Sequence, residues 1–317
     1  MYAVERQLAL LSPFPAALHP DADQIHRQTI KWAEQYELIT SQQDRHRLDT
    51  SHYTMLMARA YPTADPVALQ LIADWNTWTF LLDDYFDEHV IGRNPDAIEH
   101  LHRQILSILA GIPPNAGDSK RIFALYNIAN RLRLLGDGEW MTRFTACVGE
   151  TLAASLWEAR NRRIRVVPTA DDYCYWRLFT SGVFCYFTLI EIAEQLPIPV
   201  FVWDHPMIEQ LAHCANAVIC WSNDIFSFAK ERAHGDVHNL VYIVQHERQL
   251  TLDDAMAYVA QQHDHEVRTF QQLCAALPHF GDGIDDFVRR YVRGLEAWMR
   301  ANMDWSVATQ RYRPTPS

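Results

Sequence analysis

The chain has 317 residues, 49% of them apolar and only 11 of them glycine, and its formal net charge is −11. That length fits one large domain or two ordinary ones, and the apolar content is ample for a large core. The negative charge argues against nucleic acid and anionic membrane surfaces as partners, because both repel an acidic protein. An acidic protein that binds an anionic ligand must recruit metal ions or concentrate its few cations locally.

No targeting or membrane segment is expected. Residues 1–11 lack a basic region followed by a long apolar run, and no window approaches 18 consecutive apolar residues. The six cysteines form no C-x-x-C pair, and most lie in apolar, helix-like sequence: Cys147, Cys174, Cys185, Cys214, Cys220 and Cys274. We expect reduced, structural thiols in a cytoplasmic protein.

Helical periodicity dominates the chain, and strand-like alternation is scarce. Pro13, Pro15 and Pro20 mark an irregular entry over about residues 1–20, and a polar tail is expected over 304–317. Apolar spacing predicts helices over residues 21–38, 45–60, 66–88, 96–110, 119–134, 138–163, 171–194, 205–231, 238–248, 251–277 and 283–303. The Pro and Gly breaks between them are short loops. The sequence therefore predicts a single all-α domain spanning residues 1–317.

An acidic cluster, residues 83–88, ends the long helix predicted over 66–88. Acidic pairs are common on solvated helix faces, and three others begin at Asp171, Asp253 and Asp285. Of the four pairs, only the one at Asp83 has a further carboxylate, Asp87, four positions after its first residue. Carboxylates crowded at the end of an aromatic-rich helix repel one another unless a cation neutralises them. By itself this cluster fits a metal site or a solvated face equally well.

A second polar motif lies 140 positions after Asp83, since 223 − 83 = 140. Asn223, Ser227 and Glu231 are spaced i, i+4, i+8, so on a helix they drift only about 80° around the axis. All three offer oxygen, the ligand that hard cations such as Mg²⁺ prefer, and Lys230 adds a positive charge beside them. An ordinary polar helix face is the alternative, but the flanking sequence is largely apolar. Together the two motifs suit a metal-held diphosphate.

Two further cationic features are weaker alone. Arg177 lies among aromatic residues, where an Arg is rarely left unpaired, so it predicts either a structural salt bridge or a bidentate phosphate ligand. The Arg311-Tyr312 pair lies in the polar tail, where such pairs are common.

Taken together, these motifs resemble those of bacterial class I terpene synthases, over nearly the whole chain. Residues 83–87 match the family's D-D-x-x-D/E motif, and residues 223–231 match its N-D-x-x-S-x-x-x-E motif. The family has a diphosphate-sensing Arg 46 positions before the Asn, and 223 − 46 = 177. Its terminal R-Y pair is matched by Arg311-Tyr312, with Trp305 six residues before that Arg.

The resemblance implies an all-α fold around a deep apolar pocket that binds three magnesium ions. Its metal ligands would be Asp83, Asp84 and Asp87 on one wall and Asn223, Ser227 and Glu231 on the other. Its diphosphate ligands would be Arg177, Lys230, Arg311 and Tyr312. The family often has an Asp and a Gly at the helix break after the sensor Arg, where this chain has Thr180 and Ser181, followed by Gly182. Arg177, Thr180 and Ser181 are therefore the predicted catalytic group.

The implied substrate is a linear isoprenyl diphosphate, and the length of the chain favours farnesyl diphosphate. Loss of diphosphate leaves an allylic carbocation, so the pocket must exclude water and present aromatic faces. The predicted wall aromatics are Phe80, Phe179 and Trp305, with Trp78, Phe86 and Tyr186 as weaker candidates. The product is not readable from the sequence, because it depends on the pocket contour.

Several alternatives stay open. A mono- or diterpene cyclase would use geranyl or geranylgeranyl diphosphate. A chain-elongating prenyl diphosphate synthase would need a second D-D-x-x-D in place of residues 223–231. A non-catalytic helical binding protein would be favoured by loss of a metal ligand, and the sequence retains all of them. A homodimer is one expected state, since helical dimers are frequent in the family.

Overall fold

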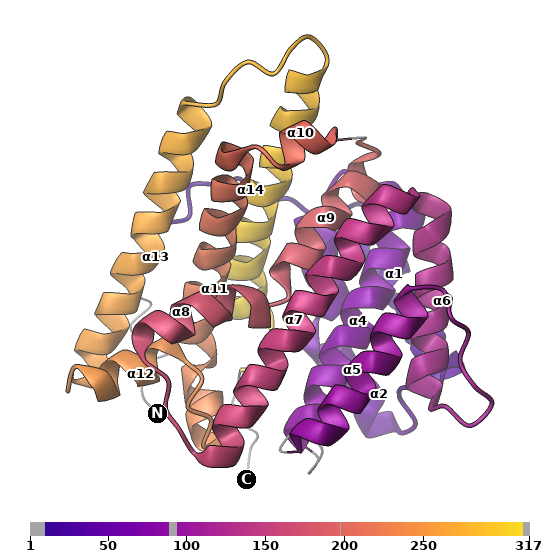
Figure 1. Ribbon diagram of the computed structural model, residues 1–317, viewed down its shortest axis with the longest axis horizontal. Helices are drawn as coiled ribbons and strands as arrows, with labels where there is room; N and C mark the ends of the chain where they lie inside the picture. Colours follow the sequence, from indigo (N-terminus) through magenta and orange to yellow (C-terminus); the bar gives the residue numbers. More distant parts are fainter. Residues whose placement is uncertain (1–9, 89–93, 197, 313–317) are drawn as a thin grey trace.

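The computed structural model describes residues 10–88, 94–196 and 198–312, apart from the side chains of Asp87 and Glu88. Within these ranges the chain forms fourteen helices and no strand, which confirms the all-α prediction (Figure 1). The helices are α1 (Ala22–Gln35), α2 (Gln42–Ser51), α3 (Tyr53–Ala60), α4 (Pro66–Glu88), α5 (Pro95–Leu109), α6 (Lys120–Leu135), α7 (Gly138–Ile164), α8 (Ala170–Thr180), α9 (Val183–Glu194), α10 (Val200–Trp203), α11 (Pro206–His234), α12 (Leu240–Glu247), α13 (Leu252–Ala275) and α14 (Ile284–Ala308).

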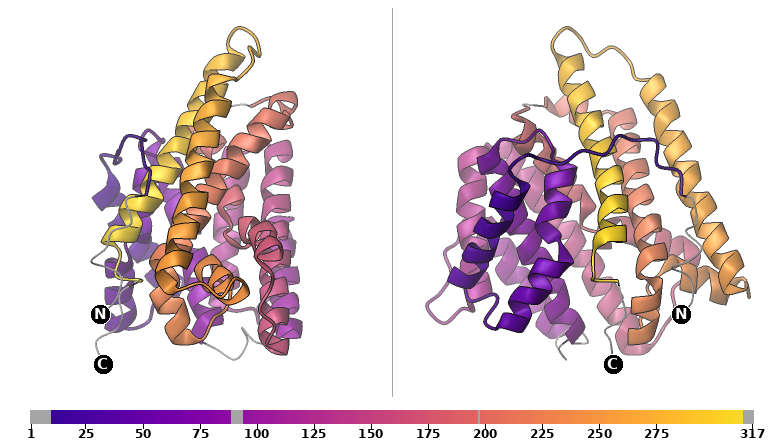
Figure 2. Two further views of the ribbon diagram at one scale, coloured as in Figure 1. Left: turned by 90° about the vertical axis from the view of Figure 1, so that its left-hand side faces the viewer. Right: turned by 180° about the vertical axis from the view of Figure 1, so that it is seen from behind.

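The helices pack as a closed ring. α4 contacts α3 and α6, α5 joins α6 to α7, and α7 contacts α8 and α9. α11 packs against α8, α9 and α14, and α14 returns to α3. α13 lies on the outside of α11, and the loop that follows it extends beyond the other helices (Figure 2). This ring leaves a space at its centre that several helices can line at once.

The apolar pattern decides where each helix lies in the ring. α5 buries one stripe, with Ile98, His102, Ile105 and Leu109 at helical spacing, so its other face meets solvent. α9 is buried from Val183 to Ala193 except at Phe184, because it has neighbours on several sides. A helix that is apolar all round belongs in the interior. None of the described helices is both long and apolar enough to cross a membrane.

The helix predicted over 45–60 is wrong as one element. His52 adopts a left-handed conformation (φ 56°) and separates α2 from α3. Distant groups replace the lost helical bonds: Trp305 Nε1 and Thr309 Oγ1 donate to the Ser51 carbonyl at 2.8 and 2.9 Å. The apolar spacing over 45–60 is helical, but the contacts of the Ser51 carbonyl with Trp305 and Thr309 divide the segment into two helices.

Three other boundaries also differ from the prediction. The segment predicted over 171–194 is two helices, α8 and α9, separated at Ser181 and Gly182, where Gly182 takes φ 68°. This break lies where the resemblance places one. The short helix α10 is additional, and α14 continues to Ala308, so the irregular tail starts later than residue 304. All six cysteines are free, as expected.

Candidate active site

A pocket of about 700 Å³ opens in the ring. It is lined by residues of α3, α4, α5, α7, α8, α9, α11 and α14, by the loop after α11 and by the chain after α14. Most of the residues singled out in the sequence lie on its wall: Phe80, Asp83, Arg177, Thr180, Ser181, Asn223, Lys230, Glu231, Trp305, Arg311 and Tyr312. The weaker candidates Trp78, Phe86 and Tyr186 lie there too.

Phe179 is the exception among the predicted aromatics. The described wall of the pocket does not include it, and its ring packs against Tyr175, Trp176 and Phe184 instead. One position separates Phe179 from Thr180, but on a helix that step turns a side chain by about 100°. The prediction that Phe179 lines the pocket is therefore wrong. The side chain of Asp87 lies outside the described residues.

The first of two polar surfaces is the α11 wall, formed by Asn223, Asp224, Ser227 and Glu231. Asn223 and Glu231 line the pocket, whereas Ser227 is 1% exposed and lies just behind them. The Ser227 hydroxyl lies close enough to Glu231 to lower the pKa of that carboxyl, yet it reaches no partner with hydrogen-bond geometry among the described residues. A buried hydroxyl without a partner between two oxygen-bearing side chains fits a hard metal ion.

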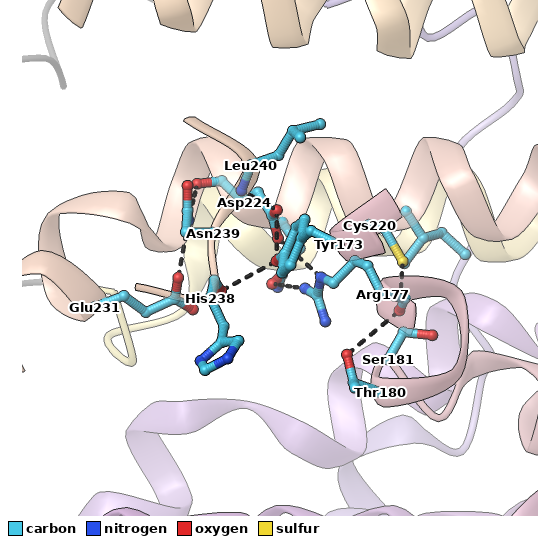
Figure 3. Close-up of polar contacts among 12 residues, drawn as sticks. Tyr173, Arg177, Thr180, Ser181, Cys220, Asp224, Glu231, His238, Asn239 and Leu240 are labelled. Atoms are coloured by element: carbon cyan, nitrogen blue, oxygen red, sulfur yellow. Dashed lines mark hydrogen bonds and ion pairs between the residues drawn. The ribbon is translucent and has the colours of Figure 1, made fainter. Parts of the chain in front are cut away.

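Asp224 faces away from the pocket and joins three elements (Figure 3). Its carboxylate accepts hydrogen bonds from Tyr173 Oη at 2.8 Å and from the Leu240 backbone N–H at 2.8 Å. Arg177 Nε donates to the other carboxylate oxygen at 2.9 Å. Burial raises the pKa of Asp224, while Arg177 acts to lower it. Arg177 thus forms a structural salt bridge with Asp224, and it also lines the pocket.

Glu231 is held from the loop after α11. Asn239 Nδ2 donates to Glu231 Oε2 at 2.8 Å and to the Asp224 carbonyl at 2.7 Å (Figure 3). Asn239 also caps α12, because its Oδ1 accepts from the backbone of Val241. Burial, and then the charge of Asp224, raise the pKa of Glu231 to about 7. This carboxyl is therefore easier to protonate than an exposed glutamate.

The second polar surface is the α4 wall, formed by Asp83 and Asp84. Asp83 is 61% exposed in its side chain, and Asp84 is 12% exposed. Arg311 contacts both carboxylates, at 2.7 Å from Asp83 and 2.5 Å from Asp84. Tyr53 Oη and Arg47 also contact Asp84, at 3.4 and 3.3 Å. Cations and a phenol from other parts of the chain therefore offset the crowding of these acids.

The Arg311-Tyr312 pair joins the two walls. Arg311 Nη1 donates to Tyr53 Oη at 2.6 Å, and its guanidinium lies 5.1 Å from the centre of the Phe80 ring. Asn223 Nδ2 donates to Tyr312 Oη at 2.5 Å, on the opposite side. Residues 228 and 89 positions apart in the sequence thereby meet at one end of the pocket. That end carries oxygen ligands, Arg177, Lys230 and Arg311 together.

The break between α8 and α9 is fastened by Asn216 of α11. Asn216 is fully buried, and its Nδ2 donates to the Leu178 carbonyl at 2.7 Å. Its Oδ1 accepts from Ser181 Oγ at 3.0 Å. Asn216 precedes Asn223 by two helical turns on α11, and its side chain holds Thr180, Ser181 and Gly182 toward the pocket.

Known proteins resemble this chain over most of its length. A family model described as terpene synthase family 2, C-terminal metal binding, matches residues 74–269. This chain belongs to the terpene synthase family. It is 40% identical to a (+)-T-muurolol synthase of Roseiflexus castenholzii over 96% of this chain and 94% of that protein. It is 34% identical to a 10-epi-cubebol synthase of Sorangium cellulosum over 96% and 97% of the two chains.

Solved terpene synthase structures share the fold. The germacradien-4-ol synthase of Streptomyces citricolor superposes with a TM-score of 0.84 at 24% identity, over 95% of this chain and 98% of that one. Together with the family's metal-binding region, this identifies the protein as an α-helical terpene synthase that uses a divalent metal.

The sequence motifs of this terpene synthase omit four residues that shape its site: Tyr53, Tyr173, Asn216 and Asn239. Asn216 carries a signal, because it is an isolated amide in the apolar run 211–221. Asn239 follows the α11 motif by eight residues and has the residue type of a helix N-cap. The two tyrosines carry none, since buried tyrosines are ordinary core residues.

Proposed function

We propose that the protein is a magnesium-dependent sesquiterpene cyclase of the cytoplasm. It would ionise farnesyl diphosphate, cyclise the resulting carbocation and release diphosphate. One observation carries the proposal: two oxygen-bearing walls and the cations Arg177, Lys230 and Arg311 line one pocket together with apolar and aromatic side chains. The (+)-T-muurolol synthase is described as cyclising (2E,6E)-farnesyl diphosphate, which supports the choice of substrate.

The polar end of the pocket would bind the metal ions and the diphosphate. Asp83, Asp84 and Asp87 on one wall, with Asn223, Ser227 and Glu231 on the other, would hold three magnesium ions. Magnesium would supply positive charge against the departing diphosphate. Arg177, Lys230, Arg311 and Tyr312 would bind the same anion directly.

The rest of the pocket would protect the carbocation. Phe80 and Trp305 lie on its wall with ring centroids 5.6 Å apart, and their faces would stabilise positive charge. Arg311 and Tyr312 join the two walls at the diphosphate end and would keep solvent out during ionisation. Thr180 and Ser181, held by Asn216, would present their polar groups beside Arg177 when the diphosphate leaves.

The test is a product assay with geranyl, farnesyl and geranylgeranyl diphosphate, each with and without magnesium. We expect magnesium-dependent C15 products from farnesyl diphosphate. Asp83→Ala and Asn223→Ala should lower diphosphate release by at least about 100-fold, the scale for losing one group that stabilises the transition state. Asp253→Asn, an exposed acidic residue on α13, is the matched control and should retain activity.

Wild-type rates in either Ala variant would contradict the metal assignment. Folded protein that releases no diphosphate from any of the three substrates would contradict the proposed function.

A further inference from the structure

Three neutral polar side chains interrupt the apolar part of the pocket. Asn76 and Thr79 on α4 and Tyr186 on α9 all line it, and we call them the hydroxyl cluster. Tyr186 Oη donates to Asn76 Oδ1 at 2.9 Å and lies 2.8 Å from Thr79 Oγ1. Asn76 Nδ2 in turn donates to the Tyr53 carbonyl at 3.0 Å, which fixes the amide.

The hydroxyl cluster lies deep in the pocket. Asn76 precedes Asp83 by seven residues on α4, so it lies about 10 Å further from the diphosphate end. Trp298 precedes Trp305 by the same number of residues on α14, and its ring centroid is 5.0 Å from that of Tyr186. The cluster is therefore on the level of the distal isoprene units of a substrate whose diphosphate is bound at the two walls.

Burying polar groups at this depth costs free energy of desolvation, so their presence calls for a specific role. Asn76 is 1% exposed and Tyr186 is 7% exposed. Phe, Val and Leu would fill the same space without any desolvation of polar groups. Burial also raises the pKa of Tyr186 far above its usual range, so the phenol stays neutral and does not serve as a phenolate base. The cluster therefore acts through fixed, neutral dipoles.

The hydrogen-bond inventory shows what these dipoles can bind. The hydroxyls of Thr79 and Tyr186 have two protons and four lone pairs between them. Tyr186 donates its proton to Asn76 Oδ1, and the Thr79 proton has two acceptors within reach, the Asn76 carbonyl at 2.9 Å and Tyr186 Oη at 2.8 Å. Both protons are therefore used inside the cluster, and at most one of the four lone pairs is. The remaining lone pairs of the two hydroxyls can accept hydrogen bonds. A water molecule bound there donates its protons to the cluster and turns its own lone pairs toward the substrate.

We propose that the hydroxyl cluster holds the water molecule that ends the cyclisation, so that the main product is a sesquiterpene alcohol. This inference rests on the proposed function. The water oxygen forms a C–O bond with the cationic carbon, and the resulting oxonium loses one proton. The cluster lies about 10 Å from the diphosphate end, so the proton passes first to a hydroxyl or water within hydrogen-bond reach of the oxonium. The released diphosphate is its final acceptor, since it is the base that ionisation leaves in the pocket. No oxidant or reductant is required.

The first test is the origin and amount of product oxygen. Wild-type protein, magnesium and farnesyl diphosphate are incubated in ¹⁸O-labelled water, and the extract is analysed by gas chromatography and mass spectrometry. We expect an alcohol as the main product, with its oxygen labelled. Products that are hydrocarbons alone would overturn the inference while leaving the cyclase proposal intact.

The second test assigns the water to the cluster. Tyr186→Phe and Thr79→Val each remove one hydroxyl with little change in shape. We expect the ratio of alcohol to hydrocarbon to fall about fivefold in each, the factor for one lost hydrogen bond. The ratio is taken within each variant, so a change in total turnover cancels. Two substitutions on different helices guard against a folding defect in either one.

Tyr61→Phe is the matched control. Tyr61 is 2% exposed, and its hydroxyl donates to the Tyr186 carbonyl at 2.7 Å, but it lies outside the wall that the described residues form around the pocket. Its product ratio should match the wild type. An unchanged ratio in both Tyr186→Phe and Thr79→Val would overturn the inference, because the water would then be held elsewhere. Absence of diphosphate release from the wild type would instead defeat the proposed function.

Discussion

The two polar walls of the pocket are built in opposite ways. In the α11 wall Asp224 and Ser227 are buried, and most contacts come from α8 and from the loop that directly follows α11, with Tyr312 as one distant partner of Asn223. The α4 wall ends in Asp83, which is 61% exposed, and both of its aspartates depend on Arg311 from the end of the chain. The α11 wall is therefore prearranged mostly by its own neighbourhood, whereas both aspartates of the α4 wall are completed by a distant segment.

The two walls are suited to different roles in binding. Ligands that are fixed before a metal arrives lose little conformational freedom when they bind it, which favours affinity. Carboxylates paired with a terminal Arg can exchange that partner when a ligand arrives, which favours closure over a substrate. We infer that the α11 wall sets the strength of metal binding and that the α4 wall couples binding to closure of the pocket.

Asp224→Asn should produce the largest difference in stability between the walls. It leaves the Arg177 guanidinium buried without its counter-charge, and breaking such a pair costs about 3–5 kcal/mol of unfolding free energy. Asp83→Asn removes a charge that is largely exposed to solvent and should cost less than about 1 kcal/mol. Urea denaturation followed by circular dichroism measures both. Equal losses would contradict the view that only the α11 wall is prearranged.

Asn239→Ser tests the support for Glu231. Serine can still cap α12, but it is too short to donate to Glu231. Loss of a residue that orients a metal ligand typically weakens metal affinity about 10- to 100-fold. The half-saturating magnesium concentration for diphosphate release should rise by that factor. Asn94→Ser, which changes the exposed N-cap of α5 in the same way, is the control. A similar rise in both variants would contradict the assignment.

The pH dependence of magnesium binding should follow Glu231. Its pKa is raised to about 7 by burial and by Asp224, so the carboxyl keeps its proton up to about that pH. A metal ligand must lose its proton, so protons compete with magnesium below pH 7. The half-saturating magnesium concentration should rise about fivefold between pH 7 and pH 6 and level off above pH 8.

The control for this profile is Asn239→Ser. The Asn239 hydrogen bond lowers the pKa of Glu231, so its loss should move the profile to higher pH. A magnesium requirement that is flat from pH 6 to pH 8 in the wild type would contradict the role of Glu231.

Tyr53→Phe should have the smallest effect. It removes the hydroxyl between Arg311 and Asp84 but keeps the ring that stacks on Phe80 with centroids 4.2 Å apart. We expect kcat/KM to fall about fivefold, the value of one hydrogen bond. Tyr291→Phe, in a buried tyrosine outside the described pocket wall, should leave kcat/KM unchanged. A loss above 100-fold would show that Tyr53 does more than orient its two partners.

The sequence alone determined the helical class and the positions of the motif residues, because both depend on local periodicity. Asn223 and Glu231 lie on one side of α11, since eight residues turn a helix only about 80° beyond two full turns. The prediction that Phe179 faces the pocket was wrong, because which face of α8 turns inward depends on what packs against it.

The tertiary structure decided which distant groups complete the site. Arg311 reaches Asp83 from 228 positions away, and Asn216 reaches Ser181 from 35 positions away. His52 breaks a helical segment because groups near the end of α14 bond to the Ser51 carbonyl. The hydroxyl cluster joins α4 to α9 across 110 positions. Helical periodicity fixes the direction of a side chain on its own helix, but only the packing of the helices fixes which partner it meets.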